Sequence, residues 1–313
     1  MDFELSADDL ALQSGIVELC RGRFTMDRIR ASEETGALDQ EMWSELVDAG
    51  VFSLRLPEDE GGVGLGCTQA VLVFEQLGRA LVPGPLVATH LGADFGLTGI
   101  VGMVDRDVSP LLVEHLDSLD RLLILAPDGV WVCDADDVQG GQVDAFLDPL
   151  TPLYAAASLP KGQLLASDGA GMKLRGAALT AAYQVGIATA VTERAVAYAK
   201  ERRQFDRPIG SFQAVKHICA DMLVRAEVAR AAVYAAGVIL DDPSAGDETR
   251  AVVAAQLLAN EAAVANGKAC VQVHGGMGFT WEVDVHLFLK RAALLATHFG
   301  SNDERAETMA AFL

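Results

Sequence analysis

The stretch ERRQFDRPIGSFQAVKH, residues 201–217, separates two long runs of apolar residues at three- and four-residue spacing. Such spacing is typical of an amphipathic helix, and it covers residues 177–202 before the stretch and 211–240 after it. Pro208 and Gly210 interrupt the helical pattern between the two runs. The sequence therefore predicts two long antiparallel helices joined by a short hairpin.

A second stretch, VQVHGGMGFT at residues 271–280, ends a third helical run that begins near residue 246. A fourth run covers residues 283–297. Four helices joined by short connections pack as an antiparallel bundle. We therefore expect the C-terminal part of the chain, residues 176–313, to be a helical bundle.

Residues 1–115 are expected to form a separate N-terminal helical domain. Ser6, followed by two aspartates, is typical of a helix start, and Gly50 is typical of a helix end. Apolar periodicity predicts further helices at residues 40–49, 68–81 and 86–101, with a glycine-rich loop over 51–66. Short β-type runs at 122–126, 130–133 and 163–166 predict a small sheet of three to five strands within a middle domain, residues 116–175. The predicted fold class is mainly α with a small β domain.

Composition limits the possible functions. The chain has 313 residues with a formal charge of −20, which argues against binding to nucleic-acid phosphates. Its five cysteines form no C-x-x-C pair, so we predict neither a metal site nor disulfides. The acidic N-terminus resembles no leader peptide, and no apolar run has the roughly 18 residues of a membrane span. We expect a cytoplasmic protein.

Three segments, in the expected order and spacing, resemble the acyl-CoA dehydrogenase superfamily. They are the loop LPEDEGGVGLG with FEQLGRA (56–66 and 74–80), the hairpin at 201–217 and the diglycine segment at 271–280. The resemblance runs from the first helix to about residue 300. It implies an N-terminal helical domain, a middle β domain and a C-terminal four-helix bundle, with FAD as the cofactor.

The resemblance also implies a site for the adenosine diphosphate (ADP) half of FAD. Arginine donates two hydrogen bonds to a diphosphate, and glycine lets backbone amides approach it closely. The family's positions for this site fall on the hairpin and on the diglycine segment: Arg202, Gln204, Phe205, Phe212, Gln213, Gln272, Gly275 and Gly276. In one departure from the family pattern, Asp206 stands where the family usually has glycine.

The family's catalytic base has no counterpart at its usual positions. The base is a carboxylate that removes the α proton of an acyl-CoA thioester, and most members place a glutamate after the last long helix. An ungapped count puts that position at Phe299, and the position used by a minority of members falls on Gly176. The family's two β-domain segments that line the flavin ring and the thioester also have no recognisable counterpart between residues 101 and 176.

These departures resemble the short, non-catalytic β-type subunit of α2β2 acyl-CoA dehydrogenases that degrade steroids in actinobacteria. The resemblance implies an oxidoreductase that acts as part of a complex. A second, catalytic subunit would supply the base. The substrate would be an acyl-CoA such as a steroid-derived CoA ester, and an electron-transfer flavoprotein would accept the electrons.

Two alternatives stay open. The chain could be a homomeric dehydrogenase that uses an unusual base, for which the weak candidates are Asp94 and His298. It could also be a scaffold of the same fold without flavin, although the diphosphate-binding residues argue against this.

Overall fold

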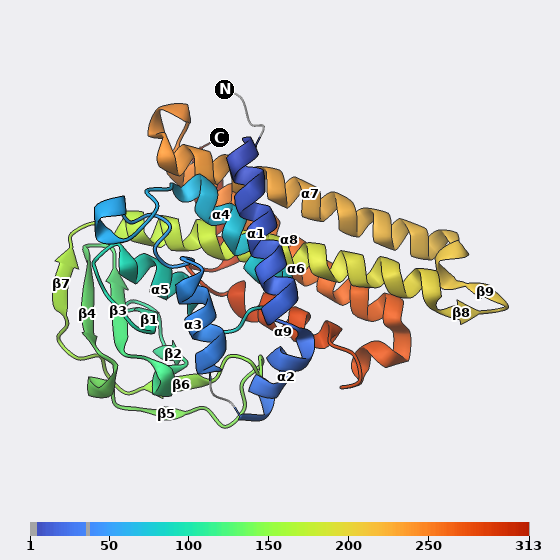
Figure 1. The fold of residues 1–313 in the computed structure, drawn as a ribbon, viewed down its shortest axis with the longest axis horizontal. Helices are drawn as coiled ribbons and strands as arrows, with labels where there is room; N and C mark the ends of the chain where they lie inside the picture. The colour runs from blue at the N-terminus through green and yellow to red at the C-terminus, as the bar shows by residue number, and fades with distance from the viewer. Residues whose placement is uncertain (1–4, 36–37, 313) are drawn as a thin grey trace.

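A computed structural model describes residues 5–35 and 38–312, and it arranges them as helices around a small β region (Figure 1). The N-terminal part contains α1 (Ala7–Arg23), α2 (Met26–Thr35), α3 (Gln40–Asp48), α4 (Cys67–Arg79) and α5 (Leu86–Ala93). The C-terminal part contains α6 (Gly169–Glu201), α7 (Gln213–Asp241), α8 (Glu248–His274), α9 (Val285–Leu295) and α10 (Asn302–Ala310). The fold class predicted from the sequence is confirmed.

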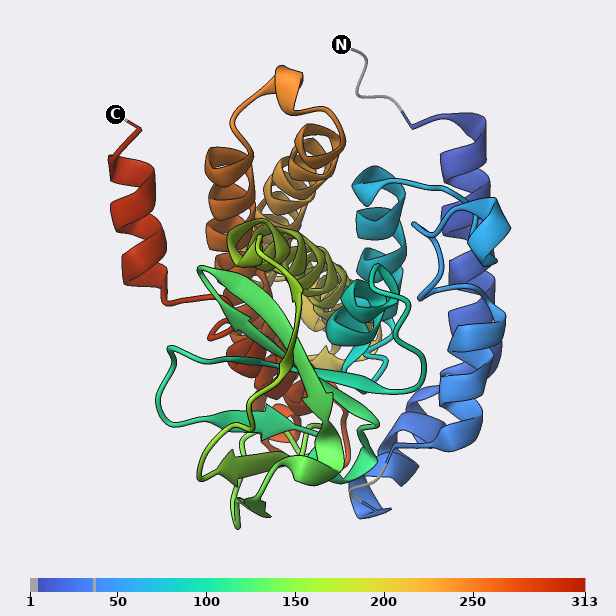
Figure 2. The same cartoon turned by 90° about the vertical axis from the view of Figure 1, so that its left-hand side faces the viewer.

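The β region lies against one end of the bundle (Figure 2). A four-stranded sheet has the order β1 (Val101–Asp105), β3 (Arg121–Ala126), β4 (Gly129–Asp134) and β7 (Gln163–Ala166). A three-stranded sheet has the order β2 (Leu112–Glu114), β6 (Leu153–Ala156) and β5 (Gly140–Gln142). Only β1 and β3 pair in parallel, and the other pairs within the two sheets are antiparallel. The described residues thus place seven strands in these sheets, more than the three to five expected.

The expected helix over residues 86–101 is wrong in its second half. Helix α5 ends at Ala93, and Gly96 and Gly99 follow with φ values of 69° and 83°, in the left-handed region that glycine adopts without strain. Val101 then begins β1, so the sheets start before residue 116. Helix α6 begins at Gly169, before the expected boundary at 176, where Asp168 accepts a hydrogen bond from the Gly171 amide.

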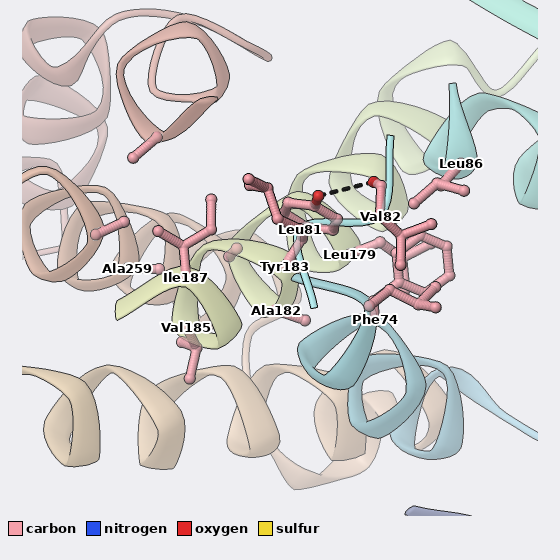
Figure 3. Packing of buried hydrophobic residues seen from close by; sticks show 14 of the residues in the cluster. Phe74, Leu81, Val82, Leu86, Leu179, Ala182, Tyr183, Val185, Ile187 and Ala259 are labelled. Carbon is pink, nitrogen blue, oxygen red and sulfur yellow. Dashed lines mark hydrogen bonds between the residues drawn. The ribbon is translucent and has the colours of Figure 1, made fainter. Parts of the chain in front are cut away.

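Helix α6 is the centre of the packing, because its middle third is buried on all sides. Figure 3 shows Leu179 and Tyr183 of α6 against Phe74 and Val82 from the α4 region. The Tyr183 hydroxyl donates a hydrogen bond of 2.8 Å to the Val82 carbonyl. This helix also links the two regions of functional interest, because it passes the β region near its start and ends at the hairpin.

Candidate functional site

The predicted hairpin and the predicted diglycine turn lie at the same end of the bundle. Strands β8 (Arg203–Gln204) and β9 (Arg207–Pro208) form the hairpin after α6, at the tip labelled in Figure 1. A 3₁₀ helix, η6 (Gly275–Phe279), forms the turn after α8. Tyr198 of α6 stacks on His274 of α8 with 4.1 Å between ring centroids, and its hydroxyl lies 3.4 Å from the His274 carbonyl. This contact holds the ends of α6 and α8 together.

The hairpin turn uses two residues in the left-handed region. Phe205 has φ 52° and Asp206 has φ 64°, as a two-residue hairpin turn requires. Aspartate tolerates this conformation, which explains how it stands where the family has glycine. Phenylalanine adopts this left-handed backbone conformation only at a cost in free energy. Phe205 is also 84% exposed. The hairpin therefore presents an aromatic ring to solvent on a strained backbone.

The predicted polar and aromatic residues of the hairpin face solvent or each other. Arg202 is exposed, and within the described residues its guanidinium has no hydrogen-bond or ion-pair partner. The Arg207 guanidinium lies over the Phe212 ring at 4.1 Å, and Phe205 meets Phe212 edge-on at 6.0 Å. Gln213 lies 3.2 Å from His217, measured between their Nε2 atoms. Arg202 is thus the hairpin arginine whose guanidinium contacts neither an aromatic ring nor a hydrogen-bond acceptor within the described residues, and its donors are free for a ligand.

The diglycine turn leaves open space above its backbone. Gly275 has φ 62°, and a Cβ atom built on Gly275 or Gly276 would meet no atom within 4 Å. Gln272, one turn earlier on α8, is exposed. We name the predicted set of eight residues the clamp: Arg202, Gln204, Phe205, Phe212, Gln213, Gln272, Gly275 and Gly276. An anionic group could approach its amides and Arg202 without displacing any side chain.

A cavity of about 840 Å³ lies between the β region and the bundle, beside the first half of α6. The wall of the cavity is mostly apolar. One side comes from the start of α5 and from β1 and β2. The other side comes from Thr180 and Tyr183 of α6 and from residues 294–302, which cover the end of α9 and the segment that follows it. Arg202 follows Tyr183 by 19 residues, which is about 28 Å along a helix that rises 1.5 Å per residue. The clamp and the cavity of one chain are therefore far apart.

The two usual positions of the family's base meet at the cavity. The Phe299 ring lies against Gly176, and a Cβ atom at residue 176 would be only 2.4 Å from Phe299 Cζ. Phe299 itself has φ 58° and lines the cavity. The aromatic ring therefore occupies the space that a side chain from residue 176 would need.

The two substitute bases have different surroundings. Asp94 forms an ion pair of 3.0 Å with Arg55, and it does not line the cavity. His298 does line the cavity, and its Nε2 lies 2.8 Å from Oε1 of Glu114 at the end of β2. Burial tends to raise the pKa of Glu114, but the charge and hydrogen bond of His298 outweigh burial and lower that pKa to about 2. Glu114 is therefore a carboxylate at neutral pH.

A second buried pair joins the bundle to the β region beside this one. Arg291 of α9 forms an ion pair with Asp148, and its Nη1 lies 3.2 Å from the Tyr183 hydroxyl. Sequence reasoning missed Glu114, Asp148 and Arg291. The one available signal was Arg291, a charge inside the apolar run of residues 283–297, because a buried charge requires a partner.

Two family models match the chain: "Acyl-CoA dehydrogenase, N-terminal domain" over residues 6–99 and "Acyl-CoA dehydrogenase, C-terminal domain" over residues 174–313. A relative from Mycolicibacterium smegmatis, acyl-CoA dehydrogenase IpdE2, is 32% identical over 92% of this chain and 93% of its own length. The chain belongs to the acyl-CoA dehydrogenase family. It is an oxidoreductase of the type that acts on acyl-CoA, and FAD is its cofactor.

Other relatives and solved structures agree with this assignment. IpdE2 of Mycobacterium tuberculosis is 36% identical over 81% of this chain. FadE34 of the same organism is 34% identical over 80% of this chain, which spans only 39% of the length of FadE34. The ChsE4–ChsE5 complex from M. tuberculosis contains a chain with a TM-score of 0.84, 22% identity and coverage of 99% and 98%. The Tcur3481–Tcur3483 steroid acyl-CoA dehydrogenase has a TM-score of 0.83, 22% identity and coverage of 97% of both chains. These two structures support the fold.

Within residues 5–35 and 38–312, no helix combines the length and the apolar character needed to cross a membrane.

Proposed function

We propose that this chain is one subunit of a heteromeric FAD-dependent acyl-CoA dehydrogenase. In this proposal, the clamp holds the ADP half of an FAD whose flavin ring lies in a partner subunit. The partner supplies a complete β domain and the catalytic base, and an α2β2 assembly is the expected stoichiometry. The observation that carries the proposal is the separation of about 28 Å between the clamp and the chain's own cavity along α6.

The geometry of the clamp fits the cofactor. The free guanidinium of Arg202 would pair with a diphosphate, and the open backbone at Gly275 and Gly276 would let amides approach it. The exposed ring of Phe205 would be covered by the ligand or by the partner subunit. Bound FAD would supply the two-electron oxidation, while this chain would bind and orient its nucleotide end.

The absence of the usual base supports a role for a partner. Phe299 and Gly176 cannot accept a proton, and they fill the space against each other. Asp94 is held by Arg55 away from the cavity, so the alternative of a homomeric enzyme with Asp94 as base gains no support. A homomer would purify yellow and active, whereas the proposed subunit gains FAD only with a co-expressed partner.

The substrate class is proposed from the relatives. One structural neighbour is named as a steroid acyl-CoA dehydrogenase, and another belongs to a two-protein complex. By analogy, we propose that the complex oxidises a bulky, steroid-derived acyl-CoA and passes its electrons to an electron-transfer flavoprotein. Turnover of a series of acyl-CoA esters, from linear to polycyclic, tests the substrate class.

The clamp is tested by the variant Arg202→Ala in the co-expressed complex. Loss of a charge-assisted bond worth about 1.5–3 kcal/mol should weaken FAD binding roughly 10- to 100-fold. Arg203→Ala is the matched control, because Arg203 lies in the same hairpin but donates to the Asp206 carbonyl at 2.9 Å. Flavin per complex, measured by absorbance after gel filtration, should fall only in the first variant. Equal flavin content in both variants would contradict the proposal and favour the flavin-free scaffold.

A further inference from the structure

We propose that His298, positioned by Glu114, is a proton acceptor in this chain's own cavity. The inference goes beyond the proposed function, in which a partner supplies the base for the FAD held by the clamp. It concerns a different place in the fold, where the usual glutamate is missing. The ligand would be an acyl thioester with a bulky apolar acyl group, because most of the cavity wall is apolar.

The geometry gives His298 a defined tautomer. Because Glu114 is a carboxylate, Nε2 of His298 must donate the 2.8 Å hydrogen bond to its Oε1 atom. In the neutral form of the ring, the lone pair then lies on Nδ1. Within the described residues, Nδ1 has no hydrogen-bond partner. A histidine whose one nitrogen is fixed by a carboxylate is the usual arrangement of a general base.

The pair joins two parts of the fold that enclose the cavity. Glu114 ends β2, and His298 precedes Phe299 after α9, so both side chains come from the cavity wall. The side chains of His298 and Glu114 are 21% and 23% exposed, which leaves them partly desolvated yet accessible to a ligand. The Arg305 guanidinium of α10 donates to the His298 carbonyl and fixes the backbone of this segment. Glu114 therefore orients the imidazole ring, and Arg305 fixes the backbone that carries it.

Other ionisable groups around the pair are already partnered or lie elsewhere on the wall. Arg291 is paired with Asp148, and Glu304 accepts hydrogen bonds from Ser301. Asp105, on the β1 side of the wall, is paired with Lys173. Two further groups complete the set: Asp107 lines the cavity, and His115 lies next to Glu114 in the chain. Among these groups, His298 combines an unpartnered basic ring nitrogen with an orientation fixed by a carboxylate.

The proposed step is a proton transfer. The C–H bond α to the thioester breaks, the proton moves to Nδ1 of His298, and the electron pair moves onto the thioester carbonyl oxygen as an enolate. The Glu114 carboxylate balances the positive charge of the imidazolium that forms. When no oxidation follows, the proton on the imidazolium exchanges with solvent, and a solvent-derived proton is returned to the same carbon. In D₂O the step therefore exchanges the α hydrogens for deuterium, without an oxidant.

The test measures this exchange by mass spectrometry in D₂O, with octanoyl-CoA and cyclohexylacetyl-CoA as probes. It uses the full chain purified without its partner, because the partner's own base would exchange the same hydrogens. General-base catalysis contributes about 10²- to 10⁴-fold, so His298→Asn should lower the exchange rate at least tenfold. Glu114→Gln keeps an acceptor for Nε2 but removes the charge, so it should give an intermediate rate. His286→Asn is the control, because His286 packs edge-on against Trp281 and does not line the cavity.

The melting temperature of the purified chains and the flavin content of the same variants in co-expressed complexes separate this inference from the proposed function. We expect His298→Asn to keep the flavin content of the wild type, whereas Arg202→Ala changes it. If His298→Asn does not assemble, Glu114→Gln tests the same pair. The inference is overturned if the wild-type chain without its partner shows no exchange, or if the tested variant exchanges at the wild-type rate.

Discussion

At the scale of single residues, His115 is the most unusual ionisable group in the described chain. Its side chain is 2% exposed, its backbone has φ 55°, and neither ring nitrogen has a hydrogen-bond partner. Burial lowers the pKa of His115 from its ordinary value of 6.5 to about 4, against the opposing charge of Glu114. The imidazole is therefore neutral in the folded protein at pH 5 and above.

This pKa predicts how stability depends on pH. Below pH 6.5 the unfolded chain binds a proton that folded His115 does not bind, so the free energy of unfolding falls until the pH reaches about 4. The contribution of this residue should be about 2 kcal/mol lower at pH 5 than at pH 8. His115→Asn suits the positive φ and does not titrate, so urea unfolding at the two pH values should show a smaller difference. An unchanged difference would show that His115 is not the cause.

The contact between Phe299 and Gly176 gives a second prediction at this scale. Gly176→Ala should destabilise the wild type by about 1–3 kcal/mol, because the new Cβ would clash with Phe299 Cζ. In a Phe299→Ala background, the same change should stabilise α6 by up to about 1 kcal/mol, because alanine favours helix over glycine. Denaturant unfolding of the four proteins measures this coupling. Additive effects would mean that the ring does not occupy this space.

At the scale of helices, α4 and α6 cross where glycines let their backbones touch. A Cβ atom on Gly78 would lie 1.9 Å from the Tyr183 carbonyl oxygen, and one on Gly186 would lie 2.0 Å from the Glu75 carbonyl oxygen. Because a backbone cannot yield as a side chain does, Gly78→Ala or Gly186→Ala should cost about 3 kcal/mol or more. Gly15→Ala in α1 is the control, because nothing lies within 4 Å of its Cβ position. Thermal unfolding should show a loss for the first two variants and none for the third.

The long helices and the central strands could be predicted from the sequence, because they follow a local periodicity. Ser6 caps α1 with a capping box as expected, and the strands at 122–126, 130–133 and 163–166 appear as β3, β4 and β7. Strand β1 could not be predicted, because only glycine turns separate it from α5. Strands β2, β5 and β6 have only three or four residues each, too few for a visible alternation.

The clamp and the cavity also differed in how far the sequence could predict their residues. The clamp lies on two segments that end neighbouring helices, so the helical reading and the resemblance both led to its residues. Two polar pairs at the cavity wall join residues 184 and 143 positions apart: the hydrogen bond between His298 and Glu114, and the ion pair between Arg291 and Asp148. No local pattern reports such a contact, and only the packing of the β region against the bundle creates it.

At the scale of the whole molecule, the clamp lies at the end of α6 and the cavity lies beside its first half, so the clamp and the chain's own cavity are separate sites. If the proposed function is right, FAD affinity depends on assembly, because the partner provides the rest of the pocket. Dilution of the flavin-loaded complex should then release FAD in step with dissociation, and excess partner should restore binding. Flavin fluorescence and mass photometry on the same dilution series measure the two events. A dissociated chain that keeps its flavin would contradict a site shared between subunits, and it would require an FAD pocket built from this chain alone.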